Sequence, residues 1–166
     1  MGHIRDDAKY PALNAEIGRT MAAVKPGGKV WARTLPGCVA TNLGWKHWLC
    51  LFPQHGPGMK HTRRIVLTPW QREIVQRHPR QFIRGLLCSD GCRAINSVHG
   101  PWVAGRRRNY AYPRYFFVNA SADIRALCGW ALDLLGIAWR QSNTRTISVA
   151  RREAVAALDE FVGPKS

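Results

Sequence analysis

The sequence predicts an α+β domain in its C-terminal part, preceded by an irregular N-terminal extension. Between Gln81 and Val162 the expected elements follow the order helix, strand, strand, helix, strand, strand, helix. Three observations give this order: apolar residues at helical spacing, short segments of high β propensity, and capping or turn residues where the elements end. We therefore divide the 166 residues into a basic and aromatic extension at 1–66 and one domain at 67–166.

The helix that opens the domain is indicated by its N-terminal residues. Thr68 and Gln71 have the spacing of a capping box, and Pro69 stands at the first helical position. The dipeptide His78-Pro79 then breaks this helix, because the residue before a proline is disfavoured in helical conformation.

A second helix is expected over Gln81–Gly91. Its apolar stripe consists of Phe82, Ile83, Leu86 and Leu87. Gly85 and Ser89 are small and four residues apart, so they share a face that another backbone can approach closely. Asp90 falls in the last turn, where the helix macrodipole disfavours a carboxylate by roughly a few tenths of a kcal/mol. Either Asp90-Gly91 is a simple turn dipeptide, or a bound cation offsets the repulsion.

The remaining elements follow from local signals. A strand is expected over Cys92–Val98, a loop rich in glycine and proline over His99–Pro113, and a strand over Arg114–Ala120. Ser121 caps the next helix, with Asp123 in its first turn and Gly136 as its stop. Two strands and a final helix complete the domain: Ile137–Ser142, Arg145–Arg151 and Ala154–Phe161.

The charge balance points to the partner. Lys and Arg number 25 and Asp and Glu number 10, which gives a formal net charge of +15. Nucleic acid is the first candidate partner and an anionic membrane surface the second, but no basic amphipathic helix is visible. The apolar runs are too short to span a bilayer, and the N-terminus lacks the apolar segment of a secretory signal. We expect a cytoplasmic, nucleoid-associated protein without a membrane partner.

The arginine triplet and the histidine-rich segment each have two interpretations, and the cysteines have one. The triplet Arg106, Arg107, Arg108 is either a solvated charge run or, given the neighbouring aromatic residues, a phosphate-contacting loop; we favour the latter. Candidate zinc ligands are His47, Cys50, His55 and His61, but their spacing matches no tetrahedral zinc pattern, and we favour a role in packing and DNA contact. The 5 cysteines are read as reduced thiols, mostly buried.

One stretch carries a family resemblance. The segment Ile83–Gly91, IRGLLCSDG, resembles the nine-residue motif of the LAGLIDADG homing endonucleases. Outright matches are Gly85, Leu86, Asp90 and Gly91. Matches in character are Ile83, Leu87 and Ser89, and departures are Arg84 and Cys88. The predicted element order is also that of the half-domain of this family.

The resemblance implies a site and an assembly. Asp90 would be the catalytic residue and would bind Mg²⁺ or Mn²⁺, with Gly91 beside it in the metal site. Because the motif occurs once, two copies of the chain would form a homodimer through Gly85 and Ser89 and act on double-stranded DNA at a pseudo-palindromic target. Such proteins are encoded by mobile elements. A supporting basic residue is expected, with Arg93 and Lys60 as candidates.

In such a fold one sheet face lies in the major groove of DNA. By alternation we assign Phe116 and Val118 to the core, which leaves Tyr115, Phe117 and Asn119 facing DNA; a register shifted by one residue is the alternative, because Phe117 fits this role poorly. The complete set of expected DNA contacts is Asn96, Arg106, Arg107, Arg108, Tyr115, Asn119, Gln141, Asn143, Arg145 and Ser148.

Two other functions fit the same residues. A DNA-binding transcriptional regulator would keep the fold without cleaving DNA, and the departure at Cys88 favours it. An RNA-binding accessory protein such as a maturase would need the basic exterior more than it needs Asp90. We favour the endonuclease because Asp90-Gly91 is intact.

Overall fold

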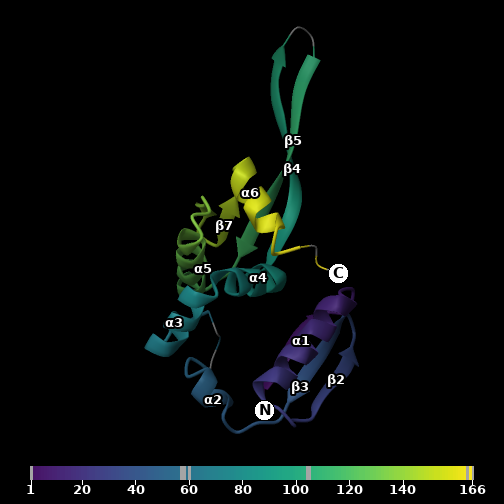
Figure 1. The fold of residues 1–166 in the computed structure, drawn as a ribbon. Helices are drawn as coiled ribbons and strands as arrows, with labels where there is room; N and C mark the ends of the chain where they lie inside the picture. Colours follow the sequence, from purple (N-terminus) through teal and green to yellow (C-terminus); the bar gives the residue numbers. More distant parts are fainter. Residues whose placement is uncertain (1, 57–58, 60, 104–105, 164, 166) are drawn as a thin grey trace. The chain divides into compact units, whose positions relative to one another are not determined.

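The computed structural model describes residues 2–56, 59, 61–103, 106–163 and 165, with the side chains at 101–103 and 106–108 left out. The chain forms two compact units. Unit 1 comprises Met1–Pro57 with Pro164–Ser166, and unit 2 comprises Gly58–Gly163. We describe each unit separately (Figure 1).

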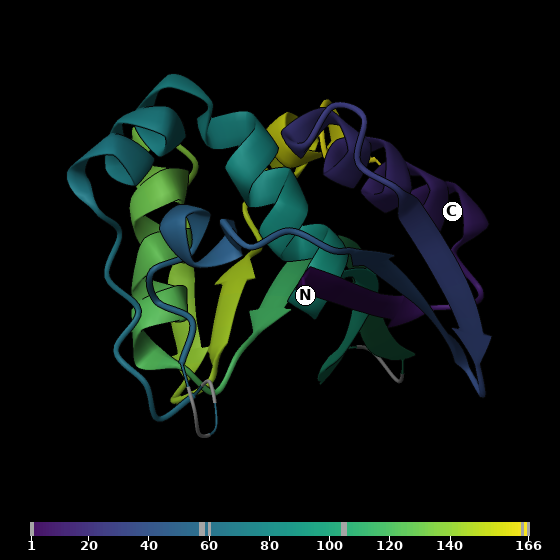
Figure 2. The same cartoon turned by 90° about the horizontal axis from the view of Figure 1, so that it is seen from below.

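Unit 1 is regular, which corrects the prediction of an irregular extension. Its strands β1 and β2 both pair antiparallel with β3, so the sheet order is β1-β3-β2. Helix α1 runs alongside β2 and β3 (Figure 2). The elements are β1 (Gly2–Asp7), α1 (Pro11–Val24), β2 (Val30–Leu35), β3 (Cys38–Leu43) and α2 (Trp48–Leu51).

Unit 2 begins with two consecutive helices and continues with the expected succession of strands and helices. Its elements are α3 (Pro69–Arg77), α4 (Pro79–Asp90), β4 (Gly91–Val103), β5 (Arg106–Val118), α5 (Ala122–Leu134), β6 (Arg140–Asn143), β7 (Thr146–Val149) and α6 (Arg152–Asp159). The sheet order is β4-β5-β7-β6, and each of its pairs is antiparallel. The described part of the chain is therefore α+β, with two antiparallel sheets.

The helix boundaries are formed by the predicted residues. The Gln71 side chain accepts the Thr68 backbone NH at 3.0 Å, which completes the capping box of α3. The Ser121 hydroxyl accepts the NH of Ile124 at the start of α5. After α5, Gly136 takes a φ of +64°, a conformation that glycine adopts without strain.

Strands β4 and β5 form one long hairpin, so the predicted loop at 99–113 is wrong. The pairing runs from Gly91 opposite Phe117 to Val103 opposite Arg106, with an irregularity between His99 and Trp102. Strand β7 pairs with β5 only from Tyr115 to Val118. The far half of the hairpin is therefore a two-stranded ribbon that extends beyond the helices of unit 2 (Figure 1).

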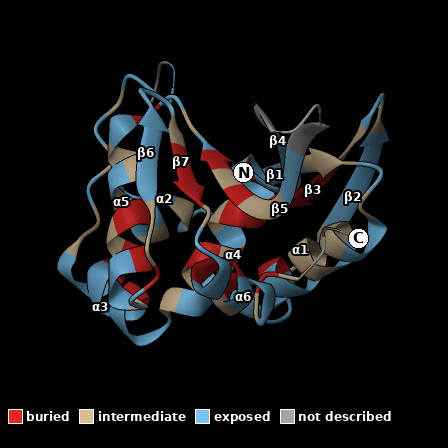
Figure 3. Cartoon of the chain, turned by 90° about the horizontal axis from the view of Figure 1, so that it is seen from above, coloured by how far each residue is buried: buried red, intermediate tan, exposed pale blue. Residues whose placement is uncertain are grey.

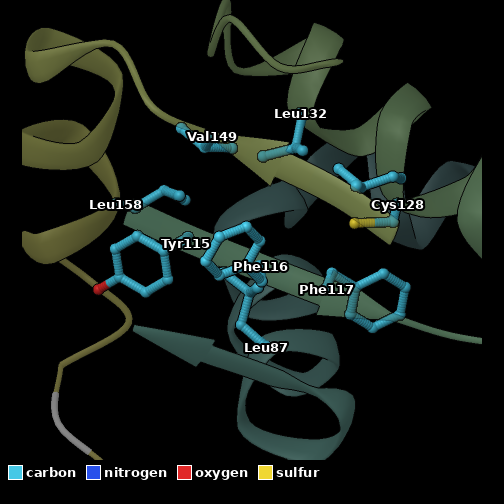
Figure 4. Close-up of a pocket in the computed structure, with 9 residues that line it drawn as sticks. Leu87, Tyr115, Phe116, Phe117, Cys128, Leu132, Val149 and Leu158 are labelled. Carbon is cyan, nitrogen blue, oxygen red and sulfur yellow. The ribbon is translucent and has the colours of Figure 1, made fainter. Parts of the chain in front are cut away.

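Helices α4, α5 and α6 supply the core of unit 2 together with one sheet face. Ile83, Leu132 and Leu158 pack in one cluster with Phe117 and Ile147 of the sheet. Strand β7 is largely buried and β6 is exposed along its length (Figure 3). A gap of about 10 Å³ remains between the sheet and the helices, lined by apolar side chains (Figure 4). It is at the lower limit for one water, so it is a packing defect of the core and not a ligand pocket.

The cysteines differ from the prediction that most are buried. Cys88 and Cys128 are buried, Cys38 is half-buried, and Cys50 and Cys92 are exposed. All five are free thiols. Burial raises the pKa of the Cys128 thiol to about 12, so this group is a small apolar core residue at neutral pH.

Within the described residues, no helix has both the length and the apolarity to cross a membrane.

Candidate nucleic-acid interface

The junction of α4 and β4 presents the carboxylate of Asp90. Asp90 is the last residue of α4 and is exposed. Its Oδ2 accepts a hydrogen bond of 2.8 Å from Nδ2 of Asn119, the residue that follows β5. The amide thus offsets part of the repulsion between this carboxylate and the C-terminal end of the helix.

Asn119 connects this end of α4 to the neighbouring elements. Its Oδ1 accepts the NH of Ser121 at 2.9 Å, and its own NH donates to the carbonyl of Arg145 at 3.0 Å. The guanidinium of Arg125 donates to the Asn119 carbonyl at 2.6 Å. Asp90 and Asn119, two predicted site residues 29 positions apart, are therefore held together by a network that fixes their geometry.

Gly91 is required by the tight passage from helix to strand. A Cβ at this position would lie 2.8 Å from both Cα and the carbonyl oxygen of Leu87. The Gly91 NH donates to the same carbonyl, so the helix ends directly against the strand. The glycine of the motif thus has a steric role in this chain.

The small residues of α4 lie on its exposed side. Gly85 and Ser89 are both exposed, and a Cβ on Gly85 would meet no atom within 4 Å. Ile83 and Leu87 point the other way, into the core. The two residues of the expected interface are therefore exposed, and the packing of α4 against a second copy stays a prediction.

The sheet of unit 2 has a covered face and an open face, and the alternation predicted for β5 is inverted. Tyr115 and Phe117 are 2% and 1% exposed, and they pack under the helices with Ile147 and Val149; we call this side the covered face. The prediction that Tyr115 and Phe117 face DNA is therefore wrong by one residue. The covered side was decided by the attachment of α4, not by residue type.

The opposite side, the open face, carries two residues that the predicted alternation places in the core, together with Arg114, for which no role is predicted. Phe116 is half-buried and Val118 is 51% exposed. The guanidinium of Arg114 lies 5.2 Å from the centroid of the Phe116 ring. On the same face Asn96 donates to the Tyr112 hydroxyl at 2.8 Å, and its contact with DNA stays a prediction. Residues opposite each other in β4 and β5 lie on the same side of the sheet, so the register of the hairpin identifies this face.

Of the two polar residues expected to contact bases from β6 and β7, Ser148 is buried and Gln141 is exposed. Ser148 pairs with Phe116 and Arg140 and is 1% exposed, so its hydroxyl does not lie on the surface. Gln141 pairs with Ile147, a residue of the covered face, although β6 itself is exposed at the sheet edge. The expected base contact of Ser148 is therefore incompatible with its burial, whereas that of Gln141, which is exposed, stays a prediction.

The turn between β6 and β7 holds two further predicted residues. The Asn143 side chain accepts the NH of Arg145 at 2.9 Å, a local bond that stabilises the turn. Both residues are exposed. Their contacts with DNA remain predictions, and Asn143 also has this structural role.

The remaining basic candidates fall into two groups. The backbone of Arg106–Arg108 starts β5, but their side chains are outside the described part of the structure, and Lys60 lies entirely outside it. Arg93, the other candidate for a supporting residue, is engaged elsewhere: its Nε and NH2 donate to the two carboxylate oxygens of Asp159 at 2.8 and 2.9 Å.

Asp159 has a second partner. The Tyr115 hydroxyl donates to Asp159 Oδ1 at 2.7 Å. The hydrogen bonds from Arg93 and Tyr115 hold the pKa of Asp159 below its ordinary value, with Arg93 contributing most. Burial, reinforced by Asp159, raises the pKa of Tyr115 above its ordinary value. This group joins β4, β5 and α6 and is structural.

Asp90 alone offers few of the ligands that a divalent cation requires. Mg²⁺ in proteins is usually held by one or two carboxylates together with waters and substrate phosphates. Asp90 supplies one carboxylate per chain. Across the described residues, no group of three or more His, Cys, Asp or Glu side chains could hold a metal ion. A metal ion at Asp90 would therefore need ligands from outside the described residues of this chain.

Among its described residues, the histidine-rich segment upstream forms no cluster of this kind. His47 Nδ1 lies 4.0 Å from Cys50 Sγ, and both side chains are exposed. Trp45 and Trp48 contact each other edge to face, and Trp48 stacks on Phe52. The segment is organised by aromatic packing.

Comparison of the chain with protein-family models gives no match, and comparison with curated proteins gives none either.

Proposed function

We propose that this protein is a sequence-specific, metal-dependent endonuclease of the homing type that hydrolyses phosphodiester bonds of double-stranded DNA as a homodimer. The observation that carries the proposal is the exposed Asp90 carboxylate, fixed by Asn119 at the end of a helix whose Gly85 side is open. The order of helices and strands in unit 2 agrees with the resemblance of Ile83–Gly91 to the LAGLIDADG motif.

DNA binding is assigned to the open face and the ribbon of β4 and β5. A two-stranded ribbon fits the major groove, and the chain carries a formal charge of +15 that favours phosphate contacts. Asn96 and Arg114 are side chains of the open face that are suited to adenine and guanine. Arg106, Arg107 and Arg108 keep their proposed role as phosphate contacts.

The homodimer follows from the single carboxylate. Cleavage of both DNA strands needs two reaction centres, and one chain supplies one Asp90. Packing of α4 against its copy through Gly85 and Ser89 would bring the two carboxylates to a two-fold axis. Two adjacent carboxylates repel each other, and a divalent cation between them offsets the repulsion.

Asp90 of each copy would hold Mg²⁺ or Mn²⁺ together with DNA phosphate oxygens. The ion, when bound, supplies an activated water and stabilisation of the leaving oxygen. The residues of the chain position this chemistry: Asn119 orients the Asp90 carboxylate, and Gly91 allows the backbone to turn directly into β4.

The test is a cleavage assay on a plasmid library of random target sequences, with and without Mg²⁺. We expect the wild-type protein to linearise a subset of plasmids in Mg²⁺ only. Asp90→Asn keeps the size of the side chain and removes the charge, so it should bind the same targets without cleaving them. Glu160→Gln, at another exposed carboxylate, is the matched control and should cleave normally. Cleavage by Asp90→Asn at the wild-type rate would refute the proposal.

A DNA-binding regulator is the second candidate, and one observation favours it. Arg93 is held in a two-bond contact with Asp159 and is not free to support a transition state at Asp90. Under this function the wild-type protein and Asp90→Asn bind the same duplexes and neither cleaves them in Mg²⁺ or Mn²⁺. That joint result would replace the endonuclease proposal with the regulator.

A further inference from the structure

Unit 1 has a sheet face that the proposed function does not use. His3 on β1 and Trp31 on β2 are both paired with Asn42 of the central strand, and Arg5 and Arg33 are both paired with Ala40. Residues directly opposite in antiparallel strands project from the same side of a sheet. We call this side the Trp31 face. The pairing places on it His3, Arg5 and Asp7 of β1, Trp31, Arg33 and Leu35 of β2, and Cys38, Ala40 and Asn42 of β3.

Helix α1 covers the other side of this sheet. Leu43, next to Asn42 and therefore on the opposite face, is fully buried. Its Cδ1 lies 2.9 Å from where a Cβ on Gly28 would stand, in the turn that follows α1. The Trp31 face is thus directed away from α1, and Trp31 is 42% exposed.

The chemistry of the Trp31 face is aromatic and basic. His3, Arg5, Trp31 and Arg33 are exposed, and the two arginines flank Ala40 at a separation of two strand spacings, about 10 Å. The acidic residue on this side, Asp7, is neutralised by Lys9 at 2.8 Å. The Asn42 side chain donates to the Ala40 carbonyl at 2.9 Å, and both residues of the central strand are buried, so the exposed groups of this face come from the two outer strands.

This combination selects a polyanion that has accessible base faces. The arginines complement phosphates, and an exposed indole on a flat sheet is a stacking platform. In a duplex the base faces are hidden, so a stacking contact with Trp31 requires unpaired bases. RNA presents unpaired bases in loops, which proteins recognise by stacking and by polar contacts with 2′-hydroxyls. We propose that the Trp31 face binds single-stranded RNA.

This inference goes beyond the endonuclease proposal and is independent of it. The Trp31 face belongs to unit 1, whereas Asp90 and the open face belong to unit 2. Loss of duplex cleavage would leave RNA binding intact, and loss of RNA binding would leave cleavage intact.

The test uses the full chain and a labelled 12-nucleotide RNA of mixed sequence without self-complementarity, followed by fluorescence anisotropy. Trp31→Ala should weaken binding about tenfold, since a base stacked on an aromatic side chain contributes about 1–3 kcal/mol. Trp31→Phe keeps a ring and should recover most of the affinity. Trp70→Ala removes an indole of nearly equal exposure, 43%, outside this face and is the matched control.

The arginines are tested by salt dependence. Replacing both Arg5 and Arg33 by Gln should lower the slope of log Kd against log salt by about 1.4, or about 0.7 for each lost phosphate contact on a single strand. Arg19→Gln with Arg77→Gln removes the same charge from exposed helical positions and should leave the slope closer to that of the wild-type protein.

Three results would overturn the proposal. The first is wild-type RNA affinity in the Trp31→Ala variant. The second is tighter binding of the matching single-stranded DNA than of the RNA. The third is self-association that Trp31→Ala abolishes while RNA binding is unchanged, which would make the face a contact between copies of the chain. Melting temperatures equal to wild type confirm that each variant is folded.

Discussion

The covered and open faces of the sheet in unit 2 carry similar residue types along β5 but differ in burial. Tyr115 and Phe117 lie under the helices, whereas Arg114 and Phe116, one residue away, lie on the open face. Three consecutive aromatic residues give no alternation to read. The side of the sheet that each aromatic side chain of β5 faces is therefore set by the element attached to the hairpin and not by residue type.

The attachment here is α4. Gly91 starts β4 directly after the last helical residue and pairs with Phe117. Leu87, one turn earlier, is buried with Phe117 in the same core. The helix therefore determines that Phe117 is covered, and every second residue of β5 follows. Substitutions on the covered side and on the open side should therefore differ in their effects.

The largest expected effect separates two neighbouring phenylalanines. Phe117→Ala removes a fully buried ring and should lower the free energy of unfolding by about 3–5 kcal/mol. Phe116→Ala, on the open face, should cost clearly less because its ring is only half-buried. Urea unfolding followed by circular dichroism measures both. Equal losses, or a larger loss for Phe116→Ala, would contradict the assignment of the faces.

Two glycines of α4 and its junction sharpen the same comparison. Gly91→Ala places a Cβ against Leu87 and should destabilise the protein by about 1–3 kcal/mol. Gly85→Ala meets no neighbouring atom and should stabilise it by about 0.5–1 kcal/mol through helix propensity. Thermal unfolding at low protein concentration, without DNA, compares them. Gly18→Ala in α1 is a control for the helix effect, because that Cβ also meets no atom within 4 Å.

The smallest effect is expected at the edge of the covered face, where Asp159 meets Arg93. Because the pKa of Asp159 lies below the ordinary value of 3.8, folding favours its ionised form. This contribution is complete above a pH of about 4 and is lost as the pH falls through the pKa of the folded state. With both side chains more than one-third exposed, the ion pair contributes at most about 1 kcal/mol.

Asp159→Asn should therefore be less stable than wild type at pH 7, and the difference should shrink as the pH falls below about 4. Unfolding curves at several pH values provide the measurement. A difference in stability that stays constant over this pH range would show that ionisation of Asp159 does not contribute to the stability of the folded state.

The sequence predicted most of unit 2 because its signals are local. Thr68, Gln71 and Ser121 form the hydrogen bonds that their spacing indicates, and Gly136 takes the expected positive φ. These contacts lie within a few residues of each other, so no knowledge of the tertiary structure was needed. Asp90 was selected from the motif, and its hydrogen bond to Asn119 came only with the structure.

The remainder depends on contacts that are distant in sequence. The strands of unit 1 are short and mixed in polarity, and they become a sheet only because β3 lies between β1 and β2. Glycine and proline at 100–101 predicted a loop, yet they fall at the irregularity between His99 and Trp102 within β4. A bulge accommodates such residues in a strand, which local propensity does not reveal.

The most direct test of the account is a dimer that contains one wild-type subunit and one Asp90→Asn subunit, purified through two different tags. On a plasmid with the selected target in Mg²⁺, one carboxylate per DNA strand predicts that this mixed dimer nicks one strand and yields open circles. Linear plasmid formed at the wild-type rate, by the mixed dimer or by the Asp90→Asn homodimer, would contradict the claim that paired Asp90 residues perform the cleavage.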